Sequence, residues 1–573
     1  MARSFTIARS QSPIHNGPFT IARCDRRSHF LSPTIEIRMK LFAAVLTCFA
    51  IVAPGQAAPP EAARPNIVFI LADDMGWNQP GFNGGDPALT PHIDRLAAEG
   101  MRLNEFYTHS VCAPTRAAFL TGRYAFRTWS DWRSEDFGKP SYLAKLGLEL
   151  AHNERGEPTR RIHALDTQER TVAEALQEAG YFTALLGKWH LGEWLPEHLP
   201  MGQGFDHQYG HYAWGIDYYS KTIVHNAPAR FAVYDWHRNQ QPVQEDGYVT
   251  DLIAAEAERL IAAHKDDDNP FFLYAAFNAV HGPLNPPPGF TGDKDDPLAI
   301  RGAMLASLDQ AVGRISKAID VHGLRDNTLL IFTNDNGPVL EEMSHPFRGT
   351  KNTTFEGGVR QPAILRWPGH TTPGTTKDGL MFVADFFPTF LTLAGGKHEQ
   401  ERPLDGIDMT SMLFAGGESP RREIVFDVSG SVRLPTIREG DFKLMGEALY
   451  NIRQDPAEQT NVAAQHPSVV RRLRQRVAEV GRQRPPLGDK PLLMDPPLPY
   501  VYGQNEQQDT PAWLKSAVDA IRARQPQQWA PGETPWPKAP QGAVASKMDG
   551  LKDEAGGGDK NRDHNGNDDK PPQ

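Results

Sequence analysis

The sequence predicts an α/β fold built on a large mixed, mostly parallel sheet with helices on both faces. Short apolar runs recur between residues 66 and 333, and amphipathic segments of helical length separate them. From about Glu423 the pattern changes to short strands, which predicts a small C-terminal antiparallel-sheet subdomain. The 573 residues are 39% hydrophobic and 23% charged, a globular composition with enough apolar side chains for a large core.

Individual elements follow from the spacing of apolar residues. The predicted strands of the main sheet are 66–72, 181–186, 271–277 and 328–333. The first of them, NIVFILA, is apolar throughout, as is typical of a strand buried on both faces. The predicted helices are one with Asp166 and Glu169 as its capping box, then 250–264, 303–321 and, behind the C-terminal strands, 467–482.

Changes in composition divide the chain into five segments. The predicted segments are an upstream extension and signal peptide that is removed (1–57), the main domain (58–422), the antiparallel subdomain with its helix (423–483), a Pro-rich extension with one amphipathic helix near 513–524 (484–542), and a disordered tail (543–573). Residues 130–161 form a long charged interruption of the main domain. Loops of that length are usually functional or disordered.

From Met39 the chain has the layout of a secretory signal peptide. An apolar run over 41–52 is followed by small residues up to Ala57. The run is too short to span a membrane, so we expect an exported protein with no stable membrane span, periplasmic or extracellular, whose true start is Met39. The alternative is that this run is a buried helix of the fold.

The overall charge of the chain argues against two classes of binding partner. A net charge of −10 and a pI near 6.1 argue against a surface that coats nucleic acid or an anionic membrane. A local cluster of cations could still bind a small anion.

Polar side chains follow all four predicted strands at the point where each strand ends. They are Asp73, Asp74, Lys188, His190, His281, Asp335 and Asn336. Ligands of open α/β sheets bind beyond the carboxyl ends of the strands, so we expect these side chains to lie together. The acidic and amide members supply only oxygen, which favours Ca²⁺, or less well Mg²⁺, over zinc. The basic members, with Arg116 and Lys351, could hold an anion, which together predicts a site for an oxyanion ester.

One cysteine lies close to these residues in the predicted fold. Signal-peptide cleavage would remove Cys24 and Cys48 and leave Cys112 as the one thiol. Pro114 fits the first turn of a helix, so Cys112 is predicted at a helix N-terminus with Arg116 one turn on. A thiolate there would be an activated nucleophile. The alternative is an inert, buried cysteine.

Several motifs resemble those of the type I sulfatase family, in the family's order. They are CAPTRAAFLTGR (112–123), GYFTALLGKWHLG (180–192), TNDNG (333–337) and RGTKNTTFEGGVRQP (348–362), within a resemblance that covers about 64–463. GWNQPGFNGG, LGKWHLGEW and GIDYYS look most like the arylsulfatase B branch, the N-acetylgalactosamine-4-sulfatases and their bacterial relatives. The absence of the further cysteines that lysosomal members carry favours a bacterial enzyme.

The resemblance implies an alkaline-phosphatase-like fold and a modified nucleophile. Cys112 would be oxidised to formylglycine by a formylglycine-generating or anaerobic sulfatase-maturing enzyme. One Ca²⁺ would be held by Asp73, Asp74, Asp335, Asn336 and the modified residue 112.

The same likeness implies roles in sulfate-ester hydrolysis. Arg116, Lys188 and Lys351 would bind the sulfate, and Asp335 would take a proton from the attacking hydrate. His281 would protonate the departing alcohol, and His190 would take a proton as sulfate leaves. The implied substrates are aryl sulfates and sulfated carbohydrates, glycosaminoglycan or algal polysaccharide fragments, cleaved in an exo fashion.

Substrate contacts are expected from the loop over 203–219. The residues chosen there are His211, Trp214, Asp217 and Tyr218. The interruption at 130–161 has no counterpart in the arylsulfatase B pattern and could reshape the pocket mouth.

Two other functions are compatible with the sequence. Phosphate and phosphonate ester hydrolases of the alkaline phosphatase superfamily can also use a C-x-P-x-R motif. A non-catalytic polysaccharide-binding protein would keep the fold without turnover. Rates on matched aryl sulfate and aryl phosphate distinguish the first of these from a sulfatase.

Overall fold

The computed structural model describes residues 64–128, 151–152, 158–161, 164–193, 195–221, 234–428, 434–485, 492–493 and 512–514. All of them belong to one compact unit, which spans 62–573. The predicted signal peptide and tail, most of the interruption at 130–161 and most of the extension at 484–542 lie outside the described residues. None of the helices described is both long and apolar enough to cross a membrane.

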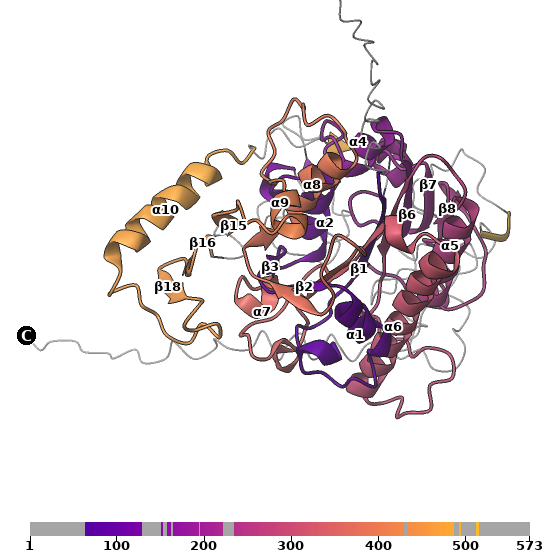
Figure 1. Ribbon diagram of the computed structural model, residues 1–573, viewed down its shortest axis with the longest axis horizontal. Helices are drawn as coiled ribbons and strands as arrows, with labels where there is room; N and C mark the ends of the chain where they lie inside the picture. The colour runs from indigo at the N-terminus through magenta and orange to yellow at the C-terminus, as the bar shows by residue number, and fades with distance from the viewer. Residues whose placement is uncertain are drawn as a thin grey trace, which may run out of the picture. The chain divides into compact units, whose positions relative to one another are not determined.

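The centre of the molecule is a ten-stranded sheet in the order β13-β2-β12-β11-β1-β10-β6-β7-β8-β9 (Figure 1). Its parallel centre consists of β11 (Thr328–Asn334), β1 (Asn66–Ala72), β10 (Phe271–Ala276), β6 (Phe182–Lys188) and β7 (His207–His211). The remaining strands are β12 (Ala363–Arg366), β2 (Met101–Leu103), β13 (Thr375–Lys377), β8 (His237–Arg238) and β9 (Gln241–Pro242). The antiparallel pairings of β12 and β8 make the sheet mixed, which confirms the predicted class.

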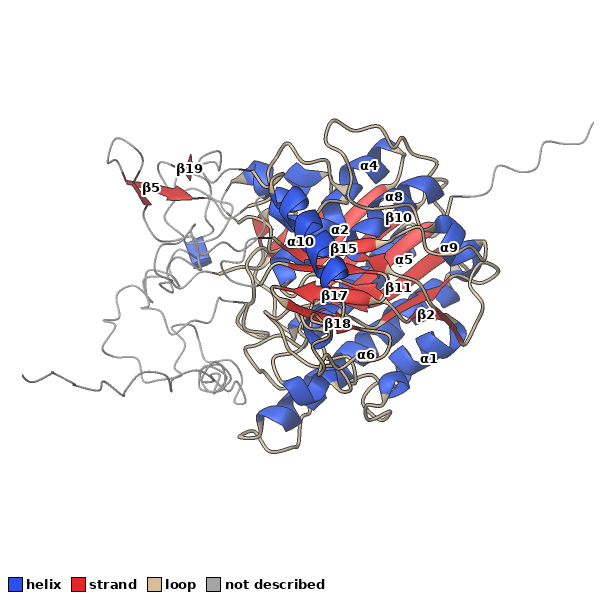
Figure 2. Cartoon of the chain, turned by 90° about the vertical axis from the view of Figure 1, so that its left-hand side faces the viewer, coloured by secondary structure: helices blue, strands red, loops and turns tan. Residues whose placement is uncertain are grey.

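Helices cover both faces of this sheet (Figure 2). One layer holds α2 (Cys112–Thr121), α4 (Val172–Glu178), α8 (Phe386–Leu393) and α9 (Thr410–Phe414). The other holds α1 (Pro91–Glu99), α5 (Val249–Ala263) and α6 (Pro297–Val321). Two short strands, β3 (Phe106–Tyr107) and β14 (Met381–Phe382), pair beside the main sheet.

The start of α4 differs from the prediction. Its cap is Thr171, whose hydroxyl accepts from the Glu174 N–H at 3.1 Å while the Glu174 carboxylate accepts from the Thr171 N–H at 2.7 Å. The predicted box had Asp166 as the cap and Glu169 as its partner three residues on, but Arg123 and Arg402 bind the Glu169 carboxylate and Arg402 also pairs with Asp166. The local spacing predicted the wrong capping box because tertiary contacts with arginines, which the spacing does not show, bind Glu169.

The predicted C-terminal sheet is present. It consists of β15 (Glu423–Asp427), β16 (Thr436–Glu439), β17 (Phe442–Met445) and β18 (Ala448–Asn451), antiparallel and in chain order. Helix α10 (Pro467–Gly481) buries Leu473, Val477 and Val480. A further small sheet pairs β4 (Ala151–His152), β5 (Pro158–Arg161) and β19 (Leu492–Leu493).

Aromatic packing joins β1 to the helix that begins at Cys112. Phe69 is fully buried, and its ring stacks on Phe119 of α2 with the centroids 4.1 Å apart. Phe386 of α8 meets the same ring edge-on at 5.1 Å. These contacts fix α2 against the strand whose end carries Asp73 and Asp74.

Phe69→Ala is expected to lower the free energy of unfolding by about 3–5 kcal/mol, because it leaves a cavity between β1 and α2. Denaturant titration measures this. Leu298→Ala is the control, since Leu298 is 51% exposed on α6 and should change the free energy by no more than about 0.5 kcal/mol. Equal losses in the two variants would be incompatible with this packing.

Candidate active site

The strand-end side chains form a buried cluster at the carboxyl ends of β1, β6, β10 and β11. Asp73, Asp74, Lys188, Asp335 and Asn336 are each no more than 2% exposed. His281 is 6% exposed and Arg116, from α2, is fully buried beside them. The expected juxtaposition is therefore present for six of the seven strand-end residues, all but His190.

Arg116 bridges two of the carboxylates. Its Nη2 donates to Asp73 Oδ2 at 3.1 Å and to Asp335 Oδ2 at 2.9 Å, while its Nη1 donates to the Lys188 carbonyl at 2.9 Å. The Lys188 ammonium also pairs with Asp73. Burial alone would raise the pKa of Asp73, but Lys188, His281 and Arg116 outweigh it and hold that pKa below its usual range. Burial and the neighbouring Asp73 raise the pKa of Asp335 to about 7.

Asp74 accepts hydrogen bonds from a second set of donors. Its Oδ1 accepts from Lys351 Nζ at 2.6 Å and from Asn336 Nδ2 at 2.7 Å. Against the effect of burial, Lys351 and His281 keep the pKa of Asp74 low. Its φ of 60° lies in the left-handed region that non-glycine residues rarely occupy, as is common at functional sites.

The oxygen donors of this cluster fit a hard cation. One ligand atom from each of Asp73, Cys112 and Asp335 lies within 4.8 Å of the others, and Asp73, Asp74 and His281 form a second such group. Asp73 Oδ1 and Asn336 Oδ1 are buried without a hydrogen-bond partner among the described residues. Buried acceptors without donors are costly, and a cation of the Ca²⁺ or Mg²⁺ class would satisfy both.

Cys112 is the first residue of α2, as predicted, and is 3% exposed. Burial raises the pKa of its thiol, although Lys188 and Lys351 oppose the rise. Of the two alternatives, this environment favours the buried cysteine over the activated thiolate, because desolvation outweighs the neighbouring cations. Without modification, Cys112 is a poor nucleophile in this position.

The two histidines differ in their surroundings. His281 Nδ1 lies 2.5 Å from the Gly282 carbonyl, which can only accept, so Nδ1 carries the proton in the neutral ring. Its Nε2 is then directed at Asp74 Oδ2, 3.7 Å away. Burial and Lys351 lower the pKa of His281 to about 3. His190, half-buried two residues beyond β6, has a φ of 62° and donates its backbone N–H to the Tyr212 carbonyl at 2.9 Å.

The predicted substrate residues separate into two kinds. His211 on β7 is in register with Lys188, and neither ring nitrogen has a hydrogen-bond partner in the described part of the chain. Trp214 packs edge-on against His281 with ring centroids 5.6 Å apart. Asp217 instead accepts from the backbone of Ser220 at 2.7 Å, and the Tyr218 hydroxyl donates to the Asn278 carbonyl at 2.7 Å. These contacts of Asp217 and Tyr218 support the loop itself and give no evidence of contact with substrate.

Sequence reasoning missed Arg301. From α6 its guanidinium donates to the carbonyls of Val280 at 3.0 Å and Asp74 at 3.2 Å, which ties the ends of β10 and β1 together. The available signal was a charged residue within the apolar face of a helix, next to Ile300 and three residues before Met304.

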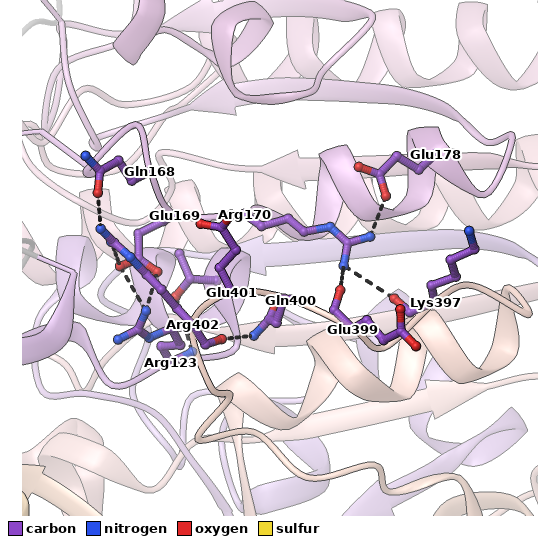
Figure 3. A pocket seen from close by; sticks show the side chains of 11 residues that line it. Arg123, Gln168, Glu169, Arg170, Glu178, Lys397, Glu399, Gln400, Glu401 and Arg402 are labelled. Carbon is purple, nitrogen blue, oxygen red and sulfur yellow. Dashed lines mark hydrogen bonds and ion pairs between the residues drawn. The ribbon is translucent and has the colours of Figure 1, made fainter. Parts of the chain in front are cut away.

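A separate pocket of about 380 Å³ lies at the other end of α2, near Thr121 (Figure 3). Its arginines are already engaged: Arg123 with Glu169, Arg170 with Glu178, and Arg402 with Glu169. These ion pairs occupy three of the four cations that line the pocket, and Lys397 is the fourth.

Comparison with known proteins identifies the family. The sulfatase family model matches residues 65–396, more than half of the chain. The chain belongs to the sulfatase family. Mouse N-acetylgalactosamine-6-sulfatase is 34% identical over 391 residues, covering 65% of this chain and 69% of that protein. Mouse arylsulfatase J is 31% identical over 382 residues, and there the match spans 65% of this chain but only 60% of the relative.

Several solved structures share the fold. Ps i-CgsB, solved in complex with k-i-k-neocarrahexaose, superimposes with a TM-score of 0.60 at 28% identity over 74% of this chain and 94% of that one. The PsFucS1 sulfatase from Pseudoalteromonas sp. gives a TM-score of 0.58 at 27% identity over 74% of this chain and 91% of that one. The phosphonate monoester hydrolase of Agrobacterium radiobacter, at 20% identity and a TM-score of 0.50 over 76% of this chain and 100% of that one, shares the fold alone. The expected alkaline-phosphatase-like sulfatase fold is thus confirmed, whereas these relatives do not support the 4-sulfatase specificity.

Arg116→Met is expected to lower the free energy of unfolding of the metal-free protein by about 3–5 kcal/mol, because Asp73 and Asp335 would lose the cation buried between them. Denaturant titration in the presence of a chelator measures this. Arg95→Met removes an exposed ion pair with Glu99 and should cost only about 0–1 kcal/mol. A loss in Arg116→Met as small as in this control would refute the bridging role.

Proposed function

We propose that this sulfatase-family protein hydrolyses sulfate esters of carbohydrates, with an exo mode of action, and also cleaves small aryl sulfates. The observation that carries the proposal is the meeting of Cys112, at the start of α2, with the buried Asp73–Arg116–Asp335 bridge and Lys188. Such preorganised charge is usually the largest contribution to catalysis of this kind.

Conversion of Cys112 to formylglycine is part of the proposal. Support comes from the Cys112, Pro114 and Arg116 spacing, which resembles the motif that maturing enzymes read, and from the raised pKa of the thiol. The hydrated aldehyde supplies the nucleophilic oxygen that an uncharged thiol in this position lacks. The expected partner during biosynthesis is a formylglycine-generating or anaerobic sulfatase-maturing enzyme.

We further propose one Ca²⁺, in preference to Mg²⁺, held by Asp73, Asp74, Asp335, Asn336 and the modified residue 112. The support is the all-oxygen donor set and the two buried oxygens without partners. The ion supplies positive charge against the ester oxygens.

The remaining steps use side chains of the chain itself. Arg116, Lys188 and Lys351 bind and orient the sulfate, and Asp335 accepts a proton from the nucleophile. His281 protonates the departing alcohol from Nε2, the nitrogen directed at the cluster. This step requires the doubly protonated ring, because the neutral ring carries its one proton on Nδ1. His190 takes a proton as sulfate leaves.

The substrate class rests on the relatives and on one aromatic ring. Ps i-CgsB was solved with a neocarrahexaose, and a relative is named for N-acetylgalactosamine-6-sulfate cleavage. Trp214 is half-buried and its ring packs on that of His281, which supports a role in packing on a sugar ring of the substrate. Sulfated glycosaminoglycan or algal polysaccharide fragments are therefore the proposed substrates, with 4- and 6-sulfated N-acetylgalactosamine to be compared directly.

Export is proposed from the layout of residues 39–57 alone. The periplasm or the extracellular space would bring the enzyme to polysaccharide fragments outside the cytoplasm.

Cys112→Ala is expected to abolish hydrolysis of aryl sulfates and sulfated sugars while leaving the fold intact, because the nucleophile is removed. Steady-state kinetics and a thermal melt measure the two properties. Thr121→Ala, at the other end of the same helix, should retain kcat/KM within about twofold. Hydrolysis of sulfate esters by Cys112→Ala would refute the proposal that Cys112 supplies the nucleophile.

The wild-type enzyme is expected to hydrolyse an aryl sulfate with a higher kcat/KM than the matched aryl phosphate. Both rates are measured on one preparation after calcium loading. The reverse order would favour the phosphate or phosphonate hydrolase alternative.

A further inference from the structure

The short helix α7 (Glu356–Val359) is tied to the C-terminal sheet by a buried group of charges. Lys443 Nζ, from β17, lies 3.0 Å from Glu356 Oε1 and 3.0 Å from Glu458 Oε1, and all three side chains are fully buried. Glu458 also accepts the backbone N–H of Glu356 at 2.6 Å. One ammonium therefore joins the start of α7 to two separate segments of the C-terminal subdomain.

Further donors complete the surroundings of Glu356. The Tyr107 hydroxyl donates to its Oε2 at 2.6 Å, Arg360 lies 3.5 Å from the same oxygen, and Arg438 lies 3.8 Å from it. Both oxygens of Glu356 thus accept hydrogen bonds inside the protein, and a buried network of this kind holds its members in one geometry. The Glu356 carboxylate is thus buried and held in one position by its partners, and is not a surface charge.

The next two residues of α7 touch the loops of the active site, backbone to backbone. The Gly357 N–H donates to the Arg348 carbonyl at 2.8 Å, and the Gly358 carbonyl accepts from the Gly337 N–H at 3.0 Å. A Cβ added at Gly358 would lie 2.1 Å from the Thr353 carbonyl oxygen. Only glycine allows this approach.

Both loops carry residues of the buried cluster. Gly337 directly follows Asn336, and Arg348 and Thr353 flank Lys351. The Lys351 N–H in turn donates to the Pro338 carbonyl at 2.8 Å, so the two loops are also joined to each other.

A second set of contacts links the Lys351 loop to the same subdomain. Arg348 Nη1 donates to the Glu458 carbonyl at 3.2 Å. The Thr354 hydroxyl lies 2.8 Å from the Thr436 hydroxyl of β16. The loop is therefore held both through α7 and directly by the small sheet.

We propose that the C-terminal sheet is a positioning element of the active site, in which Lys443 fixes α7 through Glu356 and Glu458 and α7 fixes Asn336 and Lys351. The inference rests on the proposed function for the roles of Asn336 and Lys351. Lys443 is a positioning residue and touches no reacting atom.

The test compares Lys443→Met with Arg366→Met in the full-length protein. Arg366 is likewise a buried cation between two carboxylates, Asp320 and Glu99. It lies on β12 opposite Leu330, four residues before the carboxyl end of β11 at Asn334. Lys443→Met is expected to lower kcat/KM for an aryl sulfate and to weaken Ca²⁺ binding in calorimetric titration, each by about 10–100-fold. Arg366→Met should lower the melting temperature yet keep both quantities within about twofold of wild type.

The inference is overturned if Lys443→Met, at a temperature where it is folded, keeps kcat/KM and Ca²⁺ affinity within about twofold of Arg366→Met. Should Lys443→Met not fold, Glu458→Gln replaces it, since the amide keeps its size and its acceptor for the Glu356 N–H. That variant is expected to change both quantities in the same direction, and unchanged values overturn the inference. A wild-type protein that binds Ca²⁺ but hydrolyses no sulfate ester would refute the proposed function, and the calcium titrations would still decide the role of Lys443.

Discussion

The buried Arg116 bridge between Asp73 and Asp335 is the interaction on which the site depends. Carboxylates this deeply buried are costly unless each is paired, and the cations beside them are equally costly alone. Lys188 and Lys351 pair with Asp73 and Asp74 in the same cluster, so the two sets of charges make each other's burial possible. Two oxygens remain without donors, which is where a divalent ion fits the arrangement.

The surrounding helices and strands hold these charged side chains in fixed positions. The fully apolar β1 lies at the centre of the sheet, and its aromatic contacts with α2 bring Arg116 and Cys112 to the strand end that carries Asp73. Arg301 draws the neighbouring strand ends together from the opposite helical layer. The C-terminal sheet adds a third support, through α7, for the loops of Asn336 and Lys351.

Much of this site was predictable from the sequence because strand ends converge in a parallel sheet. The positions of Asp73, Lys188, His281 and Asp335 followed from apolar runs alone. Side-chain partners chosen by tertiary contacts were not predictable. The capping box was misplaced because Arg123 and Arg402 bind Glu169, and the low exposure of Cys112 reversed the expected shift of its pKa.

The cluster of Lys443, Glu356 and Glu458 could not be predicted from the sequence for a different reason. Its members lie far apart in the chain, on α7, on β17 and in the segment after β18, and only the tertiary fold brings them to one point. In the loop over 203–219, neighbouring polar residues looked equivalent in sequence. The structure distinguishes them, since Asp217 and Tyr218 bond to the backbone while Trp214 lies against His281. Specificity for a sulfate position depends on such loop details, which the shared motifs do not encode.

The most direct test of the proposed chemistry is the mass of the tryptic peptide 103–116 from enzyme purified out of its native host. The account predicts a peptide in which the CH₂SH group of Cys112 has been replaced by an aldehyde. An unmodified Cys112 thiol throughout a preparation that hydrolyses sulfate esters would contradict it, because a buried thiol with a raised pKa would then have to be the nucleophile.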